Sequence, residues 1–313
     1  MKALVTTKDE LRSVTDHPEP SPAAGEVKVR IHTASVTSTD QAVVDGHMDL
    51  FLTLARAKSP VRTGLEFAGV VTQDSAKFKQ GDQVFGYVSL LKGPKTHQEY
   101  ICVNENFLAP LPKDITMEQG AGIAIAGQTS LVALRQLAKL KPGQSILIVG
   151  ASGGVGAVAV QIATQMGAKV TAMAGPGQGP FLSALGADTV LDYTQQTIAS
   201  LTGAFDVVLD LSCVLKFREV RHLMTKRGLF IPADPMLNLK DFIGNLWRRQ
   251  KVGYLLVDKG HGETLKEVSD LVVSGRVKLA ENQVYPWQDY VQAFERLGQK
   301  GRNGRIILRV AAA

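Results

Sequence analysis

The chain of 313 residues is long enough for roughly two domains, each with a core of its own. A composition of 45% hydrophobic and 20% charged residues excludes wholesale disorder and a collagen-like chain. The formal net charge is +6, from 35 basic and 29 acidic residues. The basic residues look scattered, and the densest cluster, Trp247–Lys251, runs into apolar sequence. We therefore expect a solvated helix end there, and no nucleic-acid partner.

The sequence also bounds the compartment. No apolar run approaches the roughly 20 residues of a membrane helix, so we expect no membrane span. The segment Met1–Thr6 lacks the long apolar stretch of a secretion signal. Two cysteines, Cys102 and Cys213, cannot form a multi-bridge framework, and we expect both to be buried. These features indicate a reducing compartment, and we expect the cytoplasm.

The first third of the chain is β-rich. Apolar and polar side chains alternate over Val27–Ile31, the period of a half-buried strand. Further strands, separated by turn signals, are expected at Phe67–Val71, Val84–Val88 and Tyr100–Val103. Between Met117 and Leu140 small and apolar residues mix without alternation, until Lys141-Pro142-Gly143 breaks the chain.

After that break, strands alternate with helices. A strand at Ser145–Val149 precedes a helical pattern over Val155–Met166, which Gly167 ends. The other expected strands are Lys169–Met173, Thr189–Leu191, Phe205–Leu209, Leu229–Ile231 and Val252–Val257. This alternation predicts a doubly wound parallel sheet. A helix at Trp287–Leu297 and a strand at Arg305–Val310 should return to the first domain.

The most informative motif joins the first strand of this second half to its helix. The turn Gly150-Ala151-Ser152-Gly153-Gly154-Val155-Gly156 has the form A-x-G-x-x-G, with Ala151 where the dinucleotide fingerprint usually has its first glycine. Absent side chains let a pyrophosphate approach the amides at a helix N-terminus. A structural turn is the alternative, but the strand and helix context favours a cofactor site.

The choice of cofactor depends on the next strand end. No acidic residue lies between Ala168 and Ala187 to bind the ribose 2′-hydroxyl of NAD, which favours NADPH over NADH. The turn Ala174–Gly179 also lacks the Arg or Lys that would hold a 2′-phosphate, so the expected preference is small.

Six segments together resemble the medium-chain dehydrogenase/reductase superfamily, specifically its zinc-free quinone oxidoreductase and enoyl reductase branch. They are Gly25–Ile31, Ala34–Asp40, Gly64–Val71, Gly81–Gly86, Ala126–Thr129 and Ala151–Gly156. The resemblance implies an α/β protein with a GroES-like β-rich catalytic domain at 1–118, a Rossmann NAD(P)-binding domain at 119–265, and a return to the catalytic domain at 266–313. It places the active site between the two domains. We also expect a homodimer.

The resemblance also permits a test for zinc. Zinc-dependent relatives have a cysteine where Thr37 stands, a histidine where Leu65 stands and another cysteine near Ile125. None of these side chains offers a thiolate or imidazole, so we expect no metal. Without a Lewis acid, hydride transfer to the β-carbon of a conjugated carbonyl is easier than alcohol dehydrogenation. Hydrogen-bond donors can stabilise the resulting enolate.

Three residues are the candidates for catalysis by resemblance. Thr37 replaces an asparagine that can orient substrate or nicotinamide in many relatives. Asp40 lies three residues after Thr37. Thr129 would lie beside the nicotinamide. Each has a structural alternative: packing for Thr37, helix capping for Asp40, and a bond to its own helix backbone for Thr129.

Three further residues belong to the expected cofactor site. Gly175 lies in the turn after the second strand, and Gln178 stands where relatives have a lysine that pairs with the 2′-phosphate. Tyr193 matches a family tyrosine near the adenosine phosphate. We expect the histidines, including His97, to lie at the surface, and assign none as a general acid.

The function favoured by the sequence is therefore metal-free, NADPH-dependent reduction of a quinone or of the C=C bond of an α,β-unsaturated carbonyl. One alternative is a biosynthetic enoyl reductase acting on a pathway intermediate. Another is a cofactor-binding interaction protein with little turnover. The substrate is not encoded in the loops Asp45–Ser59 and Val88–His97, which we expect to line the pocket.

Overall fold

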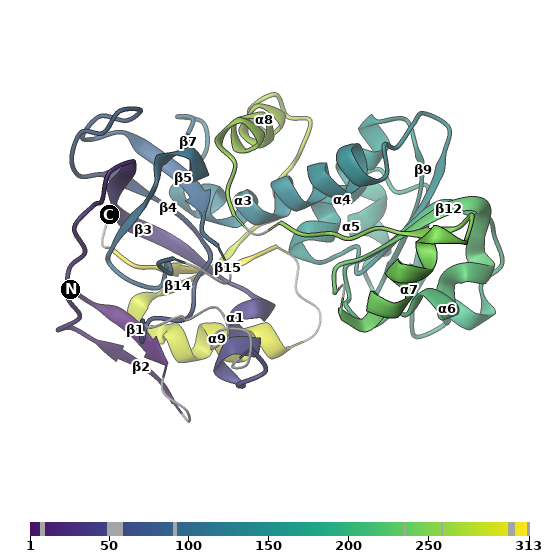
Figure 1. Cartoon of the computed structure of the whole chain (residues 1–313), viewed down its shortest axis with the longest axis horizontal. Coiled ribbons are helices and arrows are strands. Elements are labelled where there is room, and N and C mark those ends of the chain that lie inside the picture. The colour runs from purple at the N-terminus through teal and green to yellow at the C-terminus, as the bar shows by residue number, and fades with distance from the viewer. Residues whose placement is uncertain are drawn as a thin grey trace.

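A computed structural model of the chain describes residues 1–6, 10–48, 59–89, 93–234, 236–257, 259–299 and 304–311. Two β-sheets lie at opposite ends of the molecule, and helix α3 (Met117–Leu131) lies between them (Figure 1). This arrangement confirms the expected GroES-like and Rossmann architectures.

The first sheet holds the strands of the expected catalytic domain. Its order in the described chain is β14-β15-β3-β4-β5-β7, with β6 paired to β3, and all pairings except β14 with β15 are antiparallel. Its strands are β3 (Glu26–Val36), β4 (Glu66–Val71), β5 (Gln83–Tyr87), β6 (Tyr100–Asn104), β7 (Leu108–Pro110), β14 (Gln283–Pro286) and β15 (Ile306–Arg309). Strand β15 pairs with β3, so the expected return of the C-terminal segment is confirmed.

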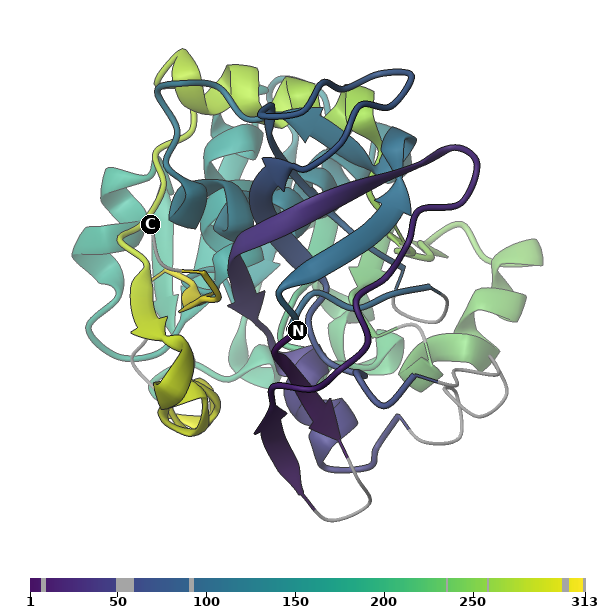
Figure 2. The same ribbon diagram turned by 90° about the vertical axis from the view of Figure 1, so that its left-hand side faces the viewer.

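A small hairpin that the sequence pattern did not indicate precedes this sheet. Strands β1 (Ala3–Thr6) and β2 (Leu11–Val14) pair antiparallel and project at one end of the molecule (Figure 2). Helices α1 (Ser38–Val44) and α9 (Tyr290–Gly298) lie next to it. The indole of Trp287 donates a hydrogen bond to the hydroxyl of Ser13, 2.8 Å away, and so ties the hairpin to the C-terminal segment.

The second sheet is parallel throughout, as predicted. Its order is β10-β9-β8-β11-β12-β13, which is 3-2-1-4-5-6 in chain order and so the order of a dinucleotide-binding fold. Its strands are β8 (Ser145–Val149), β9 (Lys169–Ala174), β10 (Thr189–Asp192), β11 (Phe205–Asp210), β12 (Met224–Pro232) and β13 (Lys251–Val252). The helices around it are α4 (Gly154–Gln165), α5 (Gly179–Ala184), α6 (Phe217–Val220) and α7 (Leu239–Ile243). Helix α8 (Gly262–Val273) instead packs on α3 and β7, beside the first sheet (Figure 1).

The last expected strand is wrong in extent. Only Lys251 and Val252 pair with β12, whereas Val252–Val257 was expected to pair throughout. Beyond Gly253 the chain leaves the sheet and runs toward α8 (Figure 1). The N–H of Gly260 donates to the carbonyl of Tyr87 in the first sheet, 3.0 Å away. The apolar run therefore bridges the two sheets instead of extending one.

One continuous core joins the two sheets. It contains Phe85 and Tyr87 of the first sheet, Ile146 and Ile148 of the second, and Ile123 of α3 between them. The sheets divide the strands in agreement with the expected domains, whose boundaries stay a prediction.

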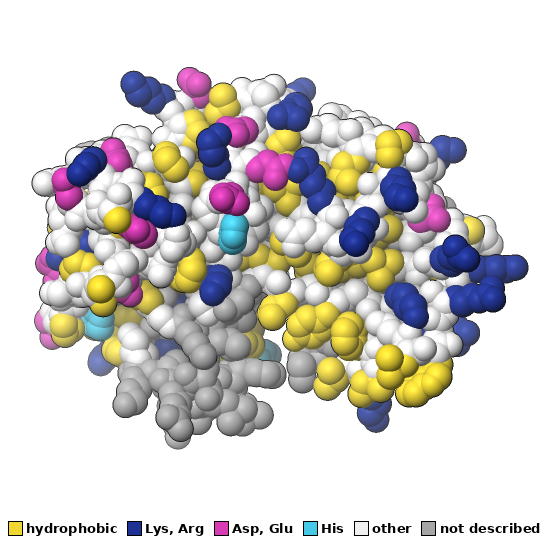
Figure 3. Space-filling model, turned by 45° about the horizontal axis from the view of Figure 1, so that its top comes forward, with side chains coloured by type: hydrophobic (Ala, Val, Ile, Leu, Met, Phe, Trp, Pro, Cys, Tyr) yellow, Lys and Arg dark blue, Asp and Glu magenta, His cyan; other side chains and the backbone are white. Residues whose placement is uncertain are grey.

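One face of the molecule carries a marked grouping of hydrophobic side chains. On the face shown in Figure 3, hydrophobic side chains gather at the lower right, near α7, with basic side chains around them. Within the described chain, no helix is both long enough and apolar enough to cross a bilayer.

The packing of α3 on α8 generates a first test. A methyl group added at Gly127 would overlap the side chain of Val268, so the two helices approach too closely for any larger residue. In an open helix, Gly→Ala stabilises by about 1 kcal/mol. Here we expect Gly127→Ala to destabilise by about 1–3 kcal/mol because of overpacking, measured by denaturant unfolding. Val268→Ala should make room, so that the double variant loses less than the sum of the single ones. Stabilisation by Gly127→Ala alone would contradict this packing.

Candidate functional site

The glycine-rich turn lies where the order of the parallel sheet reverses. Strands β8 and β11 are neighbours, and their following loops lead in opposite directions, which is where ligands bind in open α/β sheets. Gly150 adopts a φ of +78°, and the N–H groups of Gly150 and Ala151 both donate to the carbonyl of Met173 at 3.0 Å. The turn is therefore fixed by strand β9 before helix α4 begins.

Two glycines of this turn have different physical roles. A Cβ at Gly156 would overlap the carbonyl oxygen of Gly150 and lie 2.7 Å from Ala151 Cα, so α4 can pack on the turn only with glycine there. Gly153, the N-cap of α4, is exposed, and its Cβ would meet only Gly150 O, at 3.3 Å. The amides of Gly154 and Val155 follow, and the first amides of a helix have no intrahelical acceptor. These features form an open cradle suited to an anionic group.

The loop after β11 closes the other side of the turn. A Cβ at Gly150 would lie 3.1 Å from the amide nitrogen of Ser212, so the two loops touch. The buried carboxylate of Asp210 accepts hydrogen bonds from the N–H groups of Ser212 and Leu215, at 2.9 and 3.0 Å. Cys213, between them, is exposed with a φ of +61°, so its expected burial is wrong, while that of Cys102 is confirmed. The tight turn around Asp210 directs Cys213 outward.

The residues expected near the adenosine end lie after β9 and β10. A Cβ at Gly175 would be 3.3 Å from the hydroxyl of Tyr193, so the half-exposed tyrosine ring lies against that glycine. The amide oxygen of Gln178 is buried and has no hydrogen-bond partner in the described chain. An amide in this position can accept from a hydroxyl or, rotated, donate to a phosphate.

Thr37 and Asp40 form a capping box at the start of α1. The hydroxyl and the N–H of Thr37 both donate to Asp40 Oδ2 at 2.7 Å, and the N–H of Asp40 donates back to the Thr37 hydroxyl at 3.4 Å. Asp40 Oδ1 also accepts from the N–H of Gly64 at 2.5 Å. The carboxylate therefore joins α1 to the segment before β4, and the Thr37 hydroxyl proton is already engaged.

Thr129 lies in the part of α3 that contacts α4. The next residue, Ser130, donates its hydroxyl to the carbonyl of Val155 in the first turn of α4, 3.2 Å away. On its other side, the amide of Gln128 donates to the carbonyl of Lys259 and accepts from the N–H of His261, both at 3.0 Å. Half-buried Thr129 thus lies between the glycine-rich turn and the segment that bridges the sheets.

A buried ion pair that the sequence did not indicate lies close to this turn. Arg305 forms a salt bridge with fully buried Glu66, whose carboxylate also accepts from the Ser35 hydroxyl at 2.7 Å and the Ile125 N–H at 2.8 Å. A Cβ at Gly154 would overlap Arg305, so the guanidinium lies against the first turn of α4. Burial lowers the pKa of Arg305 to about 10, which leaves it charged at neutral pH. The positions 66 and 305 are too far apart in sequence for any local signal.

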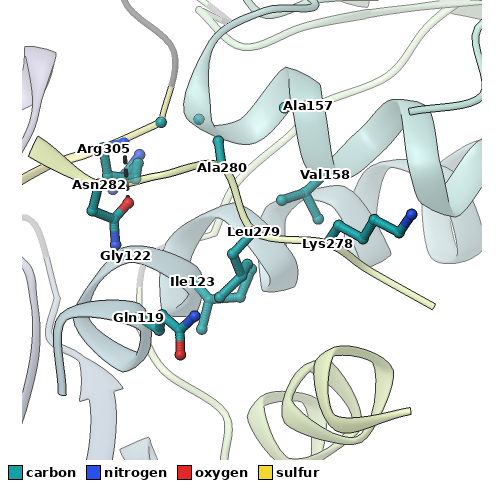
Figure 4. Close-up of a pocket in the computed structure, with 12 residues that line it drawn as sticks. Gln119, Gly122, Ile123, Ala157, Val158, Lys278, Leu279, Ala280, Asn282 and Arg305 are labelled. Atoms are coloured by element: carbon teal, nitrogen blue, oxygen red, sulfur yellow. Dashed lines mark hydrogen bonds between the residues drawn. The ribbon is translucent and has the colours of Figure 1, made fainter. Parts of the chain in front are cut away.

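A small pocket between α3 and α4 exposes part of this arrangement. Figure 4 shows Arg305 beside Asn282 at one end of the pocket and Ile123, Val158 and Leu279 forming its apolar wall. The backbone N–H of Arg305 donates to Asn282 Oδ1 at 3.2 Å. The Nε of Arg305 is buried with no hydrogen-bond partner in the described residues. This cation has unused donor capacity near the cradle.

His97 corrects the expectation of a surface histidine. Its side chain is fully buried, 2.9 Å from both the Ser35 carbonyl and the Thr63 hydroxyl. Because a carbonyl can only accept, Nε2 carries the proton, and in the neutral ring Nδ1 accepts from Thr63. Burial lowers the pKa of His97, an effect that the nearby Asp40 carboxylate partly opposes. The ring also makes an edge contact with Phe294, with centroids 5.9 Å apart.

The positions tested for zinc have no common cluster of ligands. Leu65 is buried, and the Ile125 backbone bonds Glu66. Over the described ranges, no group of three or more His, Cys, Asp or Glu residues is placed to hold a metal ion. Of the loops expected to line the substrate pocket, residues 49–58 and 90–92 lie outside the described chain.

Comparison with known proteins adds to this geometry. The sequence model of one protein family, the alcohol dehydrogenase GroES-like domain, matches residues 23–113. That of a second family, described as zinc-binding dehydrogenase, matches residues 185–308. A chloroplastic quinone oxidoreductase of Triphysaria versicolor is 29% identical, over 93% of this chain and 92% of its own. A chloroplastic NADPH-dependent alkenal/one oxidoreductase of Arabidopsis thaliana is also 29% identical, over 80% of this chain. The match spans only 64% of that relative's length.

A solved structure has the same fold over nearly the whole chain. The quinone oxidoreductase from Coxiella burnetii superposes with a TM-score of 0.88, covering 99% of both chains at 24% identity.

The burial of His97 predicts a pH dependence of stability. The unfolded chain protonates this residue near its ordinary pKa of 6.5, whereas the native state resists protonation. The contribution of neutral His97 to the unfolding free energy is therefore fully present above pH 6.5. It is lost as the pH drops below that value, by up to about 1.4 kcal/mol per pH unit. In His97→Gln, the slope of unfolding free energy between pH 6.5 and 5.5 should be shallower, while exposed His47→Gln should keep the parent slope. Equal slopes in all three proteins would contradict a neutral buried His97.

The open cradle predicts a variant that folds but does not bind cofactor. Gly153 has a φ of −69°, so valine is sterically tolerated by the backbone, yet its side chain would cover the amides of α4. Losing two or more charge-assisted hydrogen bonds, each roughly 1.5–3 kcal/mol, should weaken NADPH binding more than about 100-fold in a fluorescence titration. Gly203→Val is the matched control, since its Cβ also meets one neighbour at 3.3 Å, on Phe205. Normal NADPH binding by folded Gly153→Val would place the phosphates elsewhere.

Proposed function

This chain belongs to the medium-chain dehydrogenase/reductase superfamily, and on that premise we propose that it is a metal-free, NADPH-dependent reductase of quinones or of the C=C bond of α,β-unsaturated carbonyls. The observation that carries the proposal is the open cradle Gly150–Gly156 at the switch point of the sheet, faced by the Thr129 segment of α3. The oxidoreductase names of two relatives at 29% identity support it.

The residues of the cradle fit a dinucleotide. The residues Ala151, Ser152, Gly153, Gly154, Val155 and Gly156 would hold the diphosphate, because side chains are absent where it must approach. Arg305 adds a positive charge behind the first turn of α4. Gly175, Gln178 and Tyr193 would hold the adenosine end. When bound, the reduced nicotinamide supplies the hydride.

The remaining site residues position the reacting groups. Thr129, between α4 and the bridging segment, would lie beside the nicotinamide and can offer a hydroxyl. The Thr37 hydroxyl donates to Asp40, so it would have to leave the capping box to donate to a developing enolate. We therefore propose Asp40 as a positioning residue, and Thr37 as a donor only when its box opens. Protonation of the enolate carbon then falls to solvent or a nearby side chain.

The reaction does not require a metal in this proposal. At the positions of the zinc ligands, Thr37, Leu65 and Ile125 offer no thiolate or imidazole, and charge on the substrate oxygen is left to hydrogen-bond donors. We also propose a homodimer located in the cytoplasm. The chloroplastic relatives make localisation a separate question for this chain.

NADPH consumption against quinones, enones and enoyl thioesters tests this function directly. We expect turnover of quinones or enones, unchanged after exhaustive chelation, because no step depends on a metal. Elemental analysis should find no stoichiometric zinc. Turnover of enoyl thioesters alone would favour the biosynthetic enoyl reductase, and cofactor binding without any turnover would favour an interaction protein. Activity lost on chelation and restored by zinc would contradict the metal-free mechanism.

Cofactor preference gives a second test. The turn Ala174–Gly179 has no acid to repel the 2′-phosphate of NADPH, but also no cation to bind it. NADPH should therefore be favoured over NADH by only about 1–2 kcal/mol, roughly 5- to 30-fold in affinity. Gln178→Lys should widen that ratio by supplying a charge-assisted partner for the 2′-phosphate. The exposed substitution Gln80→Lys, in the first domain, controls for net charge. Tighter binding of NADH than NADPH by the parent protein would refute the preference.

A further inference from the structure

The positive charge of this protein is concentrated in one segment. Between Lys216 and Lys251 lie nine basic and three acidic residues, a net of +6, which equals the formal charge of the whole chain. The rest of the chain has 26 basic and 26 acidic residues. The local spacing of the basic residues suggested that they are scattered, and the count shows that this is wrong. They accumulate on α6, α7 and the adjoining parts of β12 and β13.

The same segment exposes its largest hydrophobic side chains. Leu246 and Trp247 are 78% and 79% exposed, and Ile243 is 58% exposed. Leu239 and Phe242 of α7 are also exposed. An indole with four-fifths of its surface in water is unusual in a folded protein. Trp247 and the four other exposed apolar residues form a patch of the kind that marks an interaction site.

Polar and ring contacts anchor the segment that carries the patch to the rest of the domain. Arg248 pairs with Asp241 at 3.0 Å and stacks over Phe217, with its guanidinium 4.2 Å from the ring centroid. Buried Asn238 accepts from the Phe217 N–H at 2.8 Å and donates to the Leu215 carbonyl at 3.1 Å. The segment from Asn238 to Arg248 is therefore attached to the domain at both of its ends, while the apolar side chains between them are exposed.

The charges around the patch have one sign. Lys240, Arg249 and Lys251 are exposed cations next to the apolar side chains. Asp241, the one acid between Leu237 and Lys251, is neutralised by Arg248. Figure 3 shows the yellow hydrophobic group at the lower right with dark blue side chains around it. We call these five apolar residues and three cations the basic–apolar face.

We propose that the basic–apolar face docks this protein on an anionic lipid bilayer. Exposed leucine, isoleucine and tryptophan side chains insert into the boundary between headgroups and acyl chains, where tryptophan is favoured. Lysine and arginine at the rim are attracted to anionic headgroups, by about 1 kcal/mol each near the surface. Together these contacts combine buried apolar area with electrostatic attraction, the two contributions that set the strength of interfacial binding.

Charge complementarity favours a bilayer over a second copy of the chain. A two-fold interface would join this face to its own copy, so Lys240, Arg249 and Lys251 would meet a surface whose rim charges have the same sign. Such like-charge contacts oppose association, whereas an anionic surface neutralises them. The proposal does not depend on which carbonyl compound the enzyme reduces.

Flotation with lipid vesicles tests the proposal. The full-length protein should bind vesicles of 70% phosphatidylcholine and 30% phosphatidylglycerol, and bind pure phosphatidylcholine at least about tenfold less. Raising the salt from about 0.1 to 1 M should weaken binding, because the Debye length shrinks from about 10 to 3 Å. The double variant Leu246→Ser, Trp247→Ser should lose at least about tenfold in binding. Val291→Ser, at an exposed valine of α9, is the apolar control.

Matched charge variants test the rim separately. Lys240→Gln with Arg249→Gln should weaken vesicle binding, whereas Lys141→Gln with Lys169→Gln, exposed elsewhere on the domain, should not. The melting temperature and NADPH oxidation of each variant should match the parent, which shows that the fold is retained.

Fluorescence locates the contact. The chain has two tryptophans, so Trp287→Phe leaves Trp247 as the only source of tryptophan emission. Its emission should shift to the blue and resist iodide quenching when anionic vesicles are added. Binding with Trp247 still open to iodide would overturn the proposal, since another surface would then hold the lipid. Absence of flotation, with a dimer that Leu246→Ser, Trp247→Ser dissociates, would overturn it in favour of a second copy.

Discussion

The buried carboxylate of Glu66 holds together parts of the chain that are far apart in sequence. It accepts from Ser35 of β3 and from the backbone of Ile125 in α3, and pairs with Arg305 just before β15. Removing one partner of a buried ion pair typically costs 3–5 kcal/mol, because the other charge stays uncompensated. The first sheet, the linking helix and the C-terminal return are thus fixed relative to one another at one point. That point lies against the first turn of α4, so the same ion pair sets how the first sheet meets the cradle.

The proposed function depends on what this junction brings together. The parallel sheet presents the turn Gly150–Gly156 at its switch point, and α3 passes beside it with Thr129. The segment after β13 leaves the sheet and is held by Gln128, next to Thr129, so both domains contribute to the space around the expected nicotinamide. Asp40 fixes the start of α1 in the same region through Thr37 and Gly64. The proposed hydride transfer needs such a rigid arrangement because it depends on the position of two carbon atoms.

Local patterns predicted what depends on local physics. Alternation and short apolar runs between turn signals located most strands of the first sheet, and the strand–glycine–helix order located the cradle, since all of these are properties of neighbouring residues. Contacts between residues distant in sequence were not predicted. His97 is buried because Ser35 and Thr63 form hydrogen bonds with its ring, and Glu66 pairs with Arg305 only in the folded chain. The strand at Val252–Val257 was wrong because apolar character does not distinguish a sheet partner from a bridge between domains. The charge of the basic–apolar face was present in the sequence, but it emerges only when counted over 36 residues.

Isotope transfer from the cofactor tests the proposed chemistry most directly. NADPH carrying deuterium at the transferred C4 position would be mixed with the enzyme and an enone, and the product examined by mass spectrometry and NMR. Hydride transfer to the conjugated double bond predicts one deuterium on the β-carbon, a proton from solvent on the α-carbon and an intact carbonyl. Deuterium on the carbonyl carbon of an alcohol product would contradict the account, because it would show the reaction of an alcohol dehydrogenase.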